Sequence, residues 1–157
     1  MVELAIILPL LLLLLFGITE LGRALYQQNM LTQGVELGAR YLARVEEAVT
    51  DDGAGGCNKS DDWSDYQATV ENLIKCGVDG VAGCADPLLP NIEIDYIDVC
   101  GPSNAHASCN SPSTCLITVK ASADFNSIFG GDLVAVPGFR IEGVRLNAAT
   151  QERFIGH

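Results

Sequence analysis

Six cysteines are the residues of this chain with the most evident chemistry, and all of them lie after the first fifty residues. No two of them form a C-x-x-C pair, and the only histidines are His106 and His157, which gives little support to a zinc or haem site. In an acidic stretch behind an apolar segment, six cysteines indicate up to three disulfides made in an oxidising compartment, in pairings that the sequence leaves open. The disulfide candidates are Cys57, Cys76, Cys84, Cys100, Cys109 and Cys115.

Five aspartates between positions 51 and 65 are the second group with potential chemistry. Hard cations such as calcium prefer oxygen ligands, but the spacing here is not that of an EF-hand loop. We therefore interpret them as solvated loop carboxylates and predict no metal or other cofactor. Asn58-Lys59-Ser60 fits a glycosylation sequon by pattern alone. The aspartates are Asp51, Asp52, Asp61, Asp62 and Asp65.

The sequence contains no recognisable motif of a catalytic site. The glycine-rich stretch 53–56 lacks the Lys-Ser/Thr that follows in a phosphate-binding loop. His106 lies between cysteines and His157 is terminal, so neither makes a convincing pair with a nucleophile. Trp63 and Tyr66 are better interpreted as packing residues than as a ligand platform. We predict a protein that is not an enzyme.

Charge is unevenly distributed along the chain. The net charge is −11, and residues 1–50 contribute −2 of it from three basic and five acidic side chains, which leaves −9 for the rest. An acidic domain repels phosphate backbones, so no nucleic-acid partner is expected. It also lacks the basic face that would bind anionic lipid.

The cysteines and aspartates of the head follow a stretch from Val2 to Val49, which we predict to be one long helix. It is apolar from Leu4 to Ile18 and amphipathic afterwards. At about 1.5 Å per residue it would extend roughly 70 Å, longer than any small globular core. The prediction divides the chain into a membrane or filament-core helix, residues 1–50, and a disulfide-bonded acidic head, residues 51–157.

The apolar run is 15 residues long, shorter than the roughly 20 residues that cross a bilayer. Extending it from Met1 to Leu25 gives sufficient length, but Glu3 and Glu20 then bracket the span. A simple membrane anchor is one interpretation. A secretory signal peptide fits poorly, because no basic region precedes the run and no A-x-A-like site follows it. A basic leader removed from this form of the chain would be compatible with the pattern.

Glu3 is the most informative residue of the apolar half. A carboxylate at the edge of a leucine-rich run is costly unless it has a partner, and an obvious partner is a free amino terminus, its own or that of a neighbouring copy. The alternative is that Glu3 lies at the headgroup level. Pro9, Gly17 and Gly22 weaken the helix signal, and in a filament the stretch between Pro9 and Gly22 is a candidate for partial unwinding.

From residue 21 onward the apolar positions follow helical spacing, which predicts one face covered by the head. Gly34 and Gly38 form a small-x-x-x-small pair that permits close approach of another helix. The predicted buried stripe is Leu21, Leu25, Leu31, Val35, Ala39, Leu42, Val45 and Val49. The predicted exposed side is Arg23, Gln27, Gln33, Arg40, Arg44 and Glu47.

The head begins with a loop at 51–56 and a short helix over about 65–76. Ser64 and Gln67 read as a capping box for this helix, and Gly77 suits the position after its end. Cys76 is expected to tie the helix to another part of the head.

Period-2 alternation then predicts three strands, at 92–99, 117–125 and 144–148, with a bulge in the first and with Phe139 and Ile141 leading into the last. The stretches 101–114 and 126–138 are expected to be loops. An antiparallel sheet laid on the helix stripe makes the fold class α+β.

The N-terminal segment resembles type IV pilin-like proteins, and most closely the TadE-like family of the tight-adherence (Tad) pilus system. The resemblance rests on Met1 to Leu12, on Phe16 to Tyr26, and on Gly38-Ala39-Arg40-Tyr41. It implies a leader cut by a dedicated peptidase and a pilin-like fold. In such proteins the glutamate is typically the fifth mature residue, whereas here it is the third.

The resemblance implies a structural role. Subunits are inserted in the inner membrane before assembly and are then packed into an extracellular pilus. Their partners would be copies of the same chain, other pilins and the inner-membrane assembly machinery. Glu3 would neutralise a neighbour's amino terminus within a central helix bundle. The alternatives are a minor pilin or pseudopilin that primes assembly, and a membrane-anchored binding domain that never polymerises. The predicted filament-core residues are Leu4, Ile7, Leu8, Leu11, Leu12 and Leu15.

Overall fold

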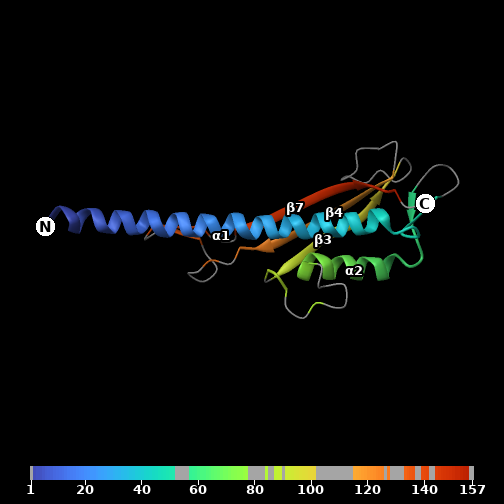
Figure 1. Ribbon diagram of the computed structural model, residues 1–157, viewed down its shortest axis with the longest axis horizontal. Helices are drawn as coiled ribbons and strands as arrows, with labels where there is room; N and C mark the ends of the chain where they lie inside the picture. The colour runs from blue at the N-terminus through green and yellow to red at the C-terminus, as the bar shows by residue number, and fades with distance from the viewer. Residues whose placement is uncertain are drawn as a thin grey trace.

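A computed structural model of the chain describes residues 2–51, 57–77, 84, 87–89, 91–101, 115–125, 127, 133–136, 139–141 and 144–155. Helix α1 (Val2–Arg44) is the longest element, and its N-terminal half projects from a small α+β head (Figure 1). Its 43 residues correspond to about 65 Å at the usual helical rise. The predicted fold class, a long apolar helix on a small antiparallel sheet with disulfides, is confirmed.

Helix α1 ends earlier than predicted, at Arg44 instead of Val49. Val49 opens strand β1 (Val49–Asp51), which pairs antiparallel with β2 (Cys57–Lys59). The physical reason is local, because Val49 and Thr50 are β-branched and favour a strand over a helix. Ala48, in the turn between the two elements, is fully buried and anchors the chain as it leaves the helix.

Helix α2 (Trp63–Cys76) packs beside the second half of α1. The predicted capping box is wrong. The helix begins two residues earlier, with Asp62 instead of Ser64 as N-cap, and Asp62 makes no side-chain capping hydrogen bond. Gly77 ends the helix with a φ of +67°, where glycine is favoured, and donates its N–H to the carbonyl oxygen of Leu73. Its predicted role at the helix end is confirmed.

Three long strands, β3 (Ile92–Cys100), β4 (Leu116–Asp124) and β7 (Arg145–Arg153), form an antiparallel sheet in the order β3-β4-β7. The predicted bulge in β3 is confirmed, and the register shifts between Ile94 and Tyr96. Helix α1 runs along this sheet with α2 at its side (Figure 1).

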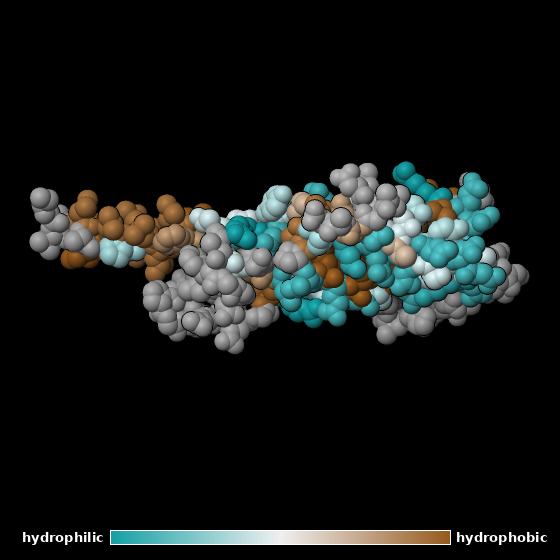
Figure 2. Space-filling view, turned by 90° about the horizontal axis from the view of Figure 1, so that it is seen from below, coloured by the Kyte–Doolittle hydropathy of each residue, from teal (hydrophilic) through white to brown (hydrophobic). Residues whose placement is uncertain are grey.

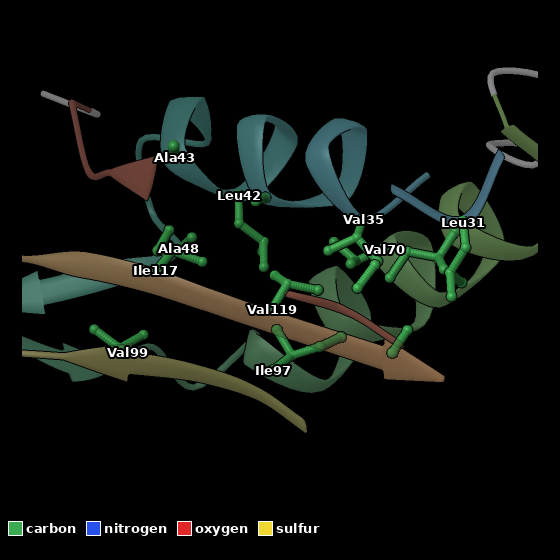
Figure 3. Packing of buried hydrophobic residues seen from close by; sticks show 14 of the residues in the cluster. Leu31, Val35, Leu42, Ala43, Ala48, Val70, Ile97, Val99, Ile117 and Val119 are labelled. Atoms are coloured by element: carbon green, nitrogen blue, oxygen red, sulfur yellow. The ribbon is translucent and has the colours of Figure 1, made fainter. Parts of the chain in front are cut away.

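The core lies between α1, α2 and the sheet. Leu31, Val35 and Leu42 point from α1 into this space (Figure 3). All three are at most 1% exposed, so the middle of the predicted stripe is confirmed. Residues of α2 and of β3 and β4 meet them there, namely Val70, Ile74, Ile97, Val99, Ile117 and Val119.

The region before β7 differs from the prediction. Phe139 and Ile141 belong to a separate strand, β6 (Phe139–Ile141), which pairs with β5 (Leu133–Val136). The predicted loop at 126–138 therefore contains a strand. Leu133-Val134-Ala135-Val136 is uniformly apolar and lacks the alternation on which the strand prediction depended.

Two disulfides join described cysteines. Cys57 at the start of β2 is bonded to Cys115 just before β4, and Cys76 at the end of α2 is bonded to Cys84. Cys100 is also disulfide-bonded, whereas Cys109 lies outside the described residues. The prediction that Cys76 ties α2 to another part of the head is confirmed.

Candidate functional site

The projecting half of α1 is the candidate functional site. The described side chains between Leu4 and Thr19 are exposed, apart from the half-buried Leu13. Figure 2 shows this segment as a largely hydrophobic rod beyond the mostly hydrophilic head. Helix α1 is long and apolar enough to cross a membrane, and only 6% of its most apolar stretch is buried within the chain. A core helix of a soluble protein would instead be mostly buried.

The six predicted filament-core residues all belong to this exposed segment. Their exposed fractions range from 45% for Leu12 to 69% for Leu4. At about 100° per residue they share one face of the helix, and Ile6, Leu10 and Leu14 make the other side apolar as well. A helix that is apolar all round requires lipid or other apolar helices on every side.

The backbone of Glu3 lies in the first turn of α1, which begins at Val2. A carboxylate is favoured at that end because of the helix dipole. The structure describes no side chain for Glu3, so neutralisation of an amino terminus stays a prediction.

The predicted weak points of the helix lie within an unbroken α1, which passes through Pro9, Gly17 and Gly22. A Cβ added at Gly17 or Gly22 would meet nothing within 4 Å. Unwinding between Pro9 and Gly22 was predicted for a filament, and the single chain leaves that prediction open.

The buried face of α1 begins at Glu20. The sequence had indicated only that this residue lies near the end of a possible membrane span. Its side chain is 2% exposed, and the hydroxyl of Ser127 donates to its Oε1 over 3.0 Å. Gln27, expected on the exposed side, is 8% exposed, whereas Leu21 and Leu25, expected in the stripe, are 60% and 58% exposed. These three expectations are wrong.

A sequence signal for this face does exist. Glu20, Gln27, Leu31 and Val35 recur at steps of seven and four residues, which is the helical period of the buried stripe. A search for apolar residues alone misses it, because its first two members are polar.

Charged side chains link the outer strands of the head. Arg145 of β7 donates to the carboxylate of Glu93 on β3 and to the hydroxyl of Ser122 on β4, the latter over 3.0 Å. The hydrogen bond from Arg145 and the negative charge of Glu93 raise the pKa of the guanidinium further above its usual value. Burial, and next the carboxylate of Glu47, raise the pKa of Tyr66. Arg145 thereby joins the three strands β3, β4 and β7 of the head.

The part of the chain that the structure describes holds no cluster of three or more metal-binding side chains. Asp61, Asp62 and Asp65 lie exposed around the start of α2. An open groove farther along α1 is lined by Leu37, Arg40, Tyr41, Arg44, Val45 and Leu73.

Residues 1–40 match the model of a family described as TadE-like protein, and no curated protein and no solved structure matches the chain. The matched range covers the exposed rod and most of the stripe beneath the head, and it confirms the resemblance seen in the sequence. Over residues 1–40 the chain is therefore similar to TadE-like proteins, and its helix α1 is long and apolar enough to cross a membrane.

Proposed function

We propose that the chain is a structural pilin subunit that polymerises through the exposed half of α1 into an extracellular filament. The observation that carries this proposal is the bare helix itself, whose large apolar side chains between Leu4 and Ile18 are 45–72% exposed, apart from the half-buried Leu13. A surface of this kind is not stable in water. Lipid covers it before assembly, and neighbouring helices cover it in a filament.

The energetics favour a bundle of such helices once the subunit leaves the membrane. Each large apolar side chain that passes from water to a packed interior contributes roughly 1.5–3 kcal/mol. Because the rod is apolar on every side, one subunit can contact several others. Heterologous contacts repeated in this way build a helical filament and not a closed dimer.

In this proposal Glu3 sets the axial register between the α1 helices of neighbouring subunits. Its carboxylate neutralises the amino terminus of a neighbouring copy inside the bundle. A buried opposite charge favours one axial alignment over others, as buried polar pairs do in some helical assemblies. The acidic head forms the outer surface, and its disulfides suit an oxidising exterior.

The direct test is the composition of pili sheared from cells, measured by quantitative mass spectrometry with the membrane fraction as a reference. The proposal expects this chain to be the most abundant protein of the filament. A few copies beside another major pilin would instead identify a minor pilin or pseudopilin. Retention of the whole population in the membrane, in cells that shed pili, would identify an anchored domain that does not polymerise.

A further inference from the structure

The groove at the C-terminal end of α1 is apolar surface that the chain itself leaves uncovered. Leu37, Tyr41 and Val45 recur every four residues, so they form one line along the end of the helix. Leu73 of α2 lines the groove as well. Leu37 is 38% exposed, although it lies within the part of α1 that the head packs against.

Two arginines line the same groove. Arg44 is exposed and makes no ion pair with a residue that the structure describes. The guanidinium of Arg40 lies 3.4 Å from Oε2 of Glu36 and 3.6 Å from Oε1 of Glu152, and all three side chains are at least 36% exposed. Exposed pairs of this kind contribute little, so Arg40 can accept a further partner. In a chain of net charge −11, the groove is a local concentration of positive charge.

The complementary charge lies around the start of α2. Glu47, Asp62 and Asp65 are exposed, and none of them makes an ion pair with a described residue. They gather around the hydroxyl of Tyr66, whose pKa is raised by burial, then by the charges of Glu47 and Asp62, and to a smaller extent by Asp65. We call Glu47, Asp62 and Asp65 the acidic tip.

The groove and the acidic tip lie at nearly the same height along α1. Helix α2 runs antiparallel to α1, because Gly34 lies against Ile74 and Gly38 against Val70 (Figure 1). Continuing that register places residues 62–65 level with positions 43–46 of the chain. The groove is centred about three turns beyond Gly34 at most, so the two surfaces differ by less than about 10 Å along the helix axis.

Arg44 and the acidic tip nevertheless belong to different sides of the subunit. Arg44 lies roughly 80° and 120° around α1 from Gly34 and Gly38, the two residues that face α2. The arginine therefore points away from α2 of its own chain. This separation leaves both charged surfaces open to another molecule.

We propose that the groove is the docking site for the head of a second copy of this chain, whose acidic tip lies against Arg40 and Arg44. The inference deepens the proposed function and rests on it. Heads of charge −9 that are packed side by side repel one another, and this contact offsets part of the repulsion. Parallel subunits with a small axial offset bring the tip of one to the groove of the next, and the opposite charges favour that offset over others. Because tip and groove are different surfaces, the contact repeats along a filament and does not close a dimer.

Charge reversal tests the contact in cells that make pili. R44E places a carboxylate in the groove, and the yield of sheared filaments should fall at least about tenfold at equal amounts of subunit in the membrane. D62K should lower the yield likewise, and Asp62 makes no side-chain capping hydrogen bond that the change would remove. R44E/D62K exchanges the two charges and should restore the yield to within about twofold of the unaltered chain. R153E is the matched control, because Arg153 is an exposed arginine of β7 that also makes no ion pair with a described residue.

A cross-link shows whether the contact joins two copies. Chains that carry R44C and chains that carry D62C, each with its own epitope tag, are expressed together, and the sheared filaments are oxidised. The inference expects a disulfide-bonded pair that contains both tags. Q33C with D62C is the control, because Gln33 is exposed and lies about 16 Å from Arg44 along the helix. The R44C and D62C pair should form at least about tenfold more cross-linked product than the control pair.

The inference requires both the restored yield and the cross-link between tags. Normal filament yield from R44E would overturn it and leave the proposed filament intact. A loss that D62K does not restore, or a cross-link no stronger than that of the control, would place the role of Arg44 within its own subunit and also overturn the inference. If the unaltered chain is absent from sheared filaments, the proposed function fails and the inference fails with it.

Discussion

The backbone carbonyl oxygen of Ile74 on α2 lies 2.9 Å from the point where a Cβ of Gly34 on α1 would be. One turn farther on, a Cβ at Gly38 would lie 2.8 Å from Cγ1 of Val70. Two glycines four residues apart therefore let α2 contact the backbone of α1 directly. The sequence pattern predicted this close approach and left its partner open, and the partner is α2 of the same chain.

Alanine at Gly34 should destabilise the head by about 1–3 kcal/mol, the usual cost of overpacking. The carbonyl oxygen of Ile74 belongs to a helix backbone and cannot turn aside as a flexible side chain can. G17A and G22A are the matched controls, because a Cβ at either site meets nothing within 4 Å and alanine favours a helix. Thermal unfolding in detergent measures the difference. Equal midpoints for G34A and G17A would contradict the packing described here.

The two disulfides should differ in their contribution to stability. Cys57–Cys115 closes a segment of 58 residues and Cys76–Cys84 a segment of 8 residues. Loop-closure entropy predicts losses of about 4 and about 2.5 kcal/mol when each pair is replaced by serines. Denaturant unfolding of the two double variants measures the order. A larger loss for the shorter loop would show that strain or packing outweighs chain entropy.

Replacement of leucines on the bare helix should separate filament packing from membrane anchoring. L11A/L15A keeps the segment apolar, so insertion should be nearly unchanged, but it leaves cavities between packed helices that cost about 2–5 kcal/mol per site. We expect a loss of at least tenfold in sheared filaments at equal amounts in the membrane. L88A, at a leucine of the head that is 45% exposed, is the control. Normal filament yield from L11A/L15A would argue against a packed bundle.

Neutralising Glu3 should reduce assembly without reducing the amount of subunit in the membrane. E3Q keeps the size and polarity of the side chain and removes the charge that pairs with an amino terminus. We expect filament yield to fall at least tenfold, measured by immunoblotting of sheared and membrane fractions. E46Q, at an exposed glutamate beyond the end of α1, should assemble normally. Undiminished assembly of E3Q would place Glu3 at the headgroup level.

The fold could be predicted where one strong pattern determined the outcome. The apolar run is recognised by its length and uniform composition, the stripe at Leu31 and Val35 by its helical period, and β4 by its period-2 alternation. The end of α1 was missed, because the local preference of Val49 for a strand competed with a continuing helical pattern. The strand β5 was missed because a short apolar run gives no periodicity.

The buried face around Glu20 could not be predicted in the same way. A glutamate in a helix is expected to be exposed, whereas Glu20 is buried against Ser127, a residue 107 positions away in the sequence. Pairings over such distances depend on the whole fold. The disulfide partners were undetermined for the same reason.

We propose that residues 4–18 pack against the same segment of neighbouring copies. A cryo-electron microscopy map of sheared filaments tests it most directly, at a resolution that resolves side chains. The account predicts a filament built of this chain, with Leu4, Leu8 and Leu11 buried between neighbouring helices and Glu3 beside a neighbour's amino terminus. A filament built of another protein, with this chain absent from its shaft, would contradict it.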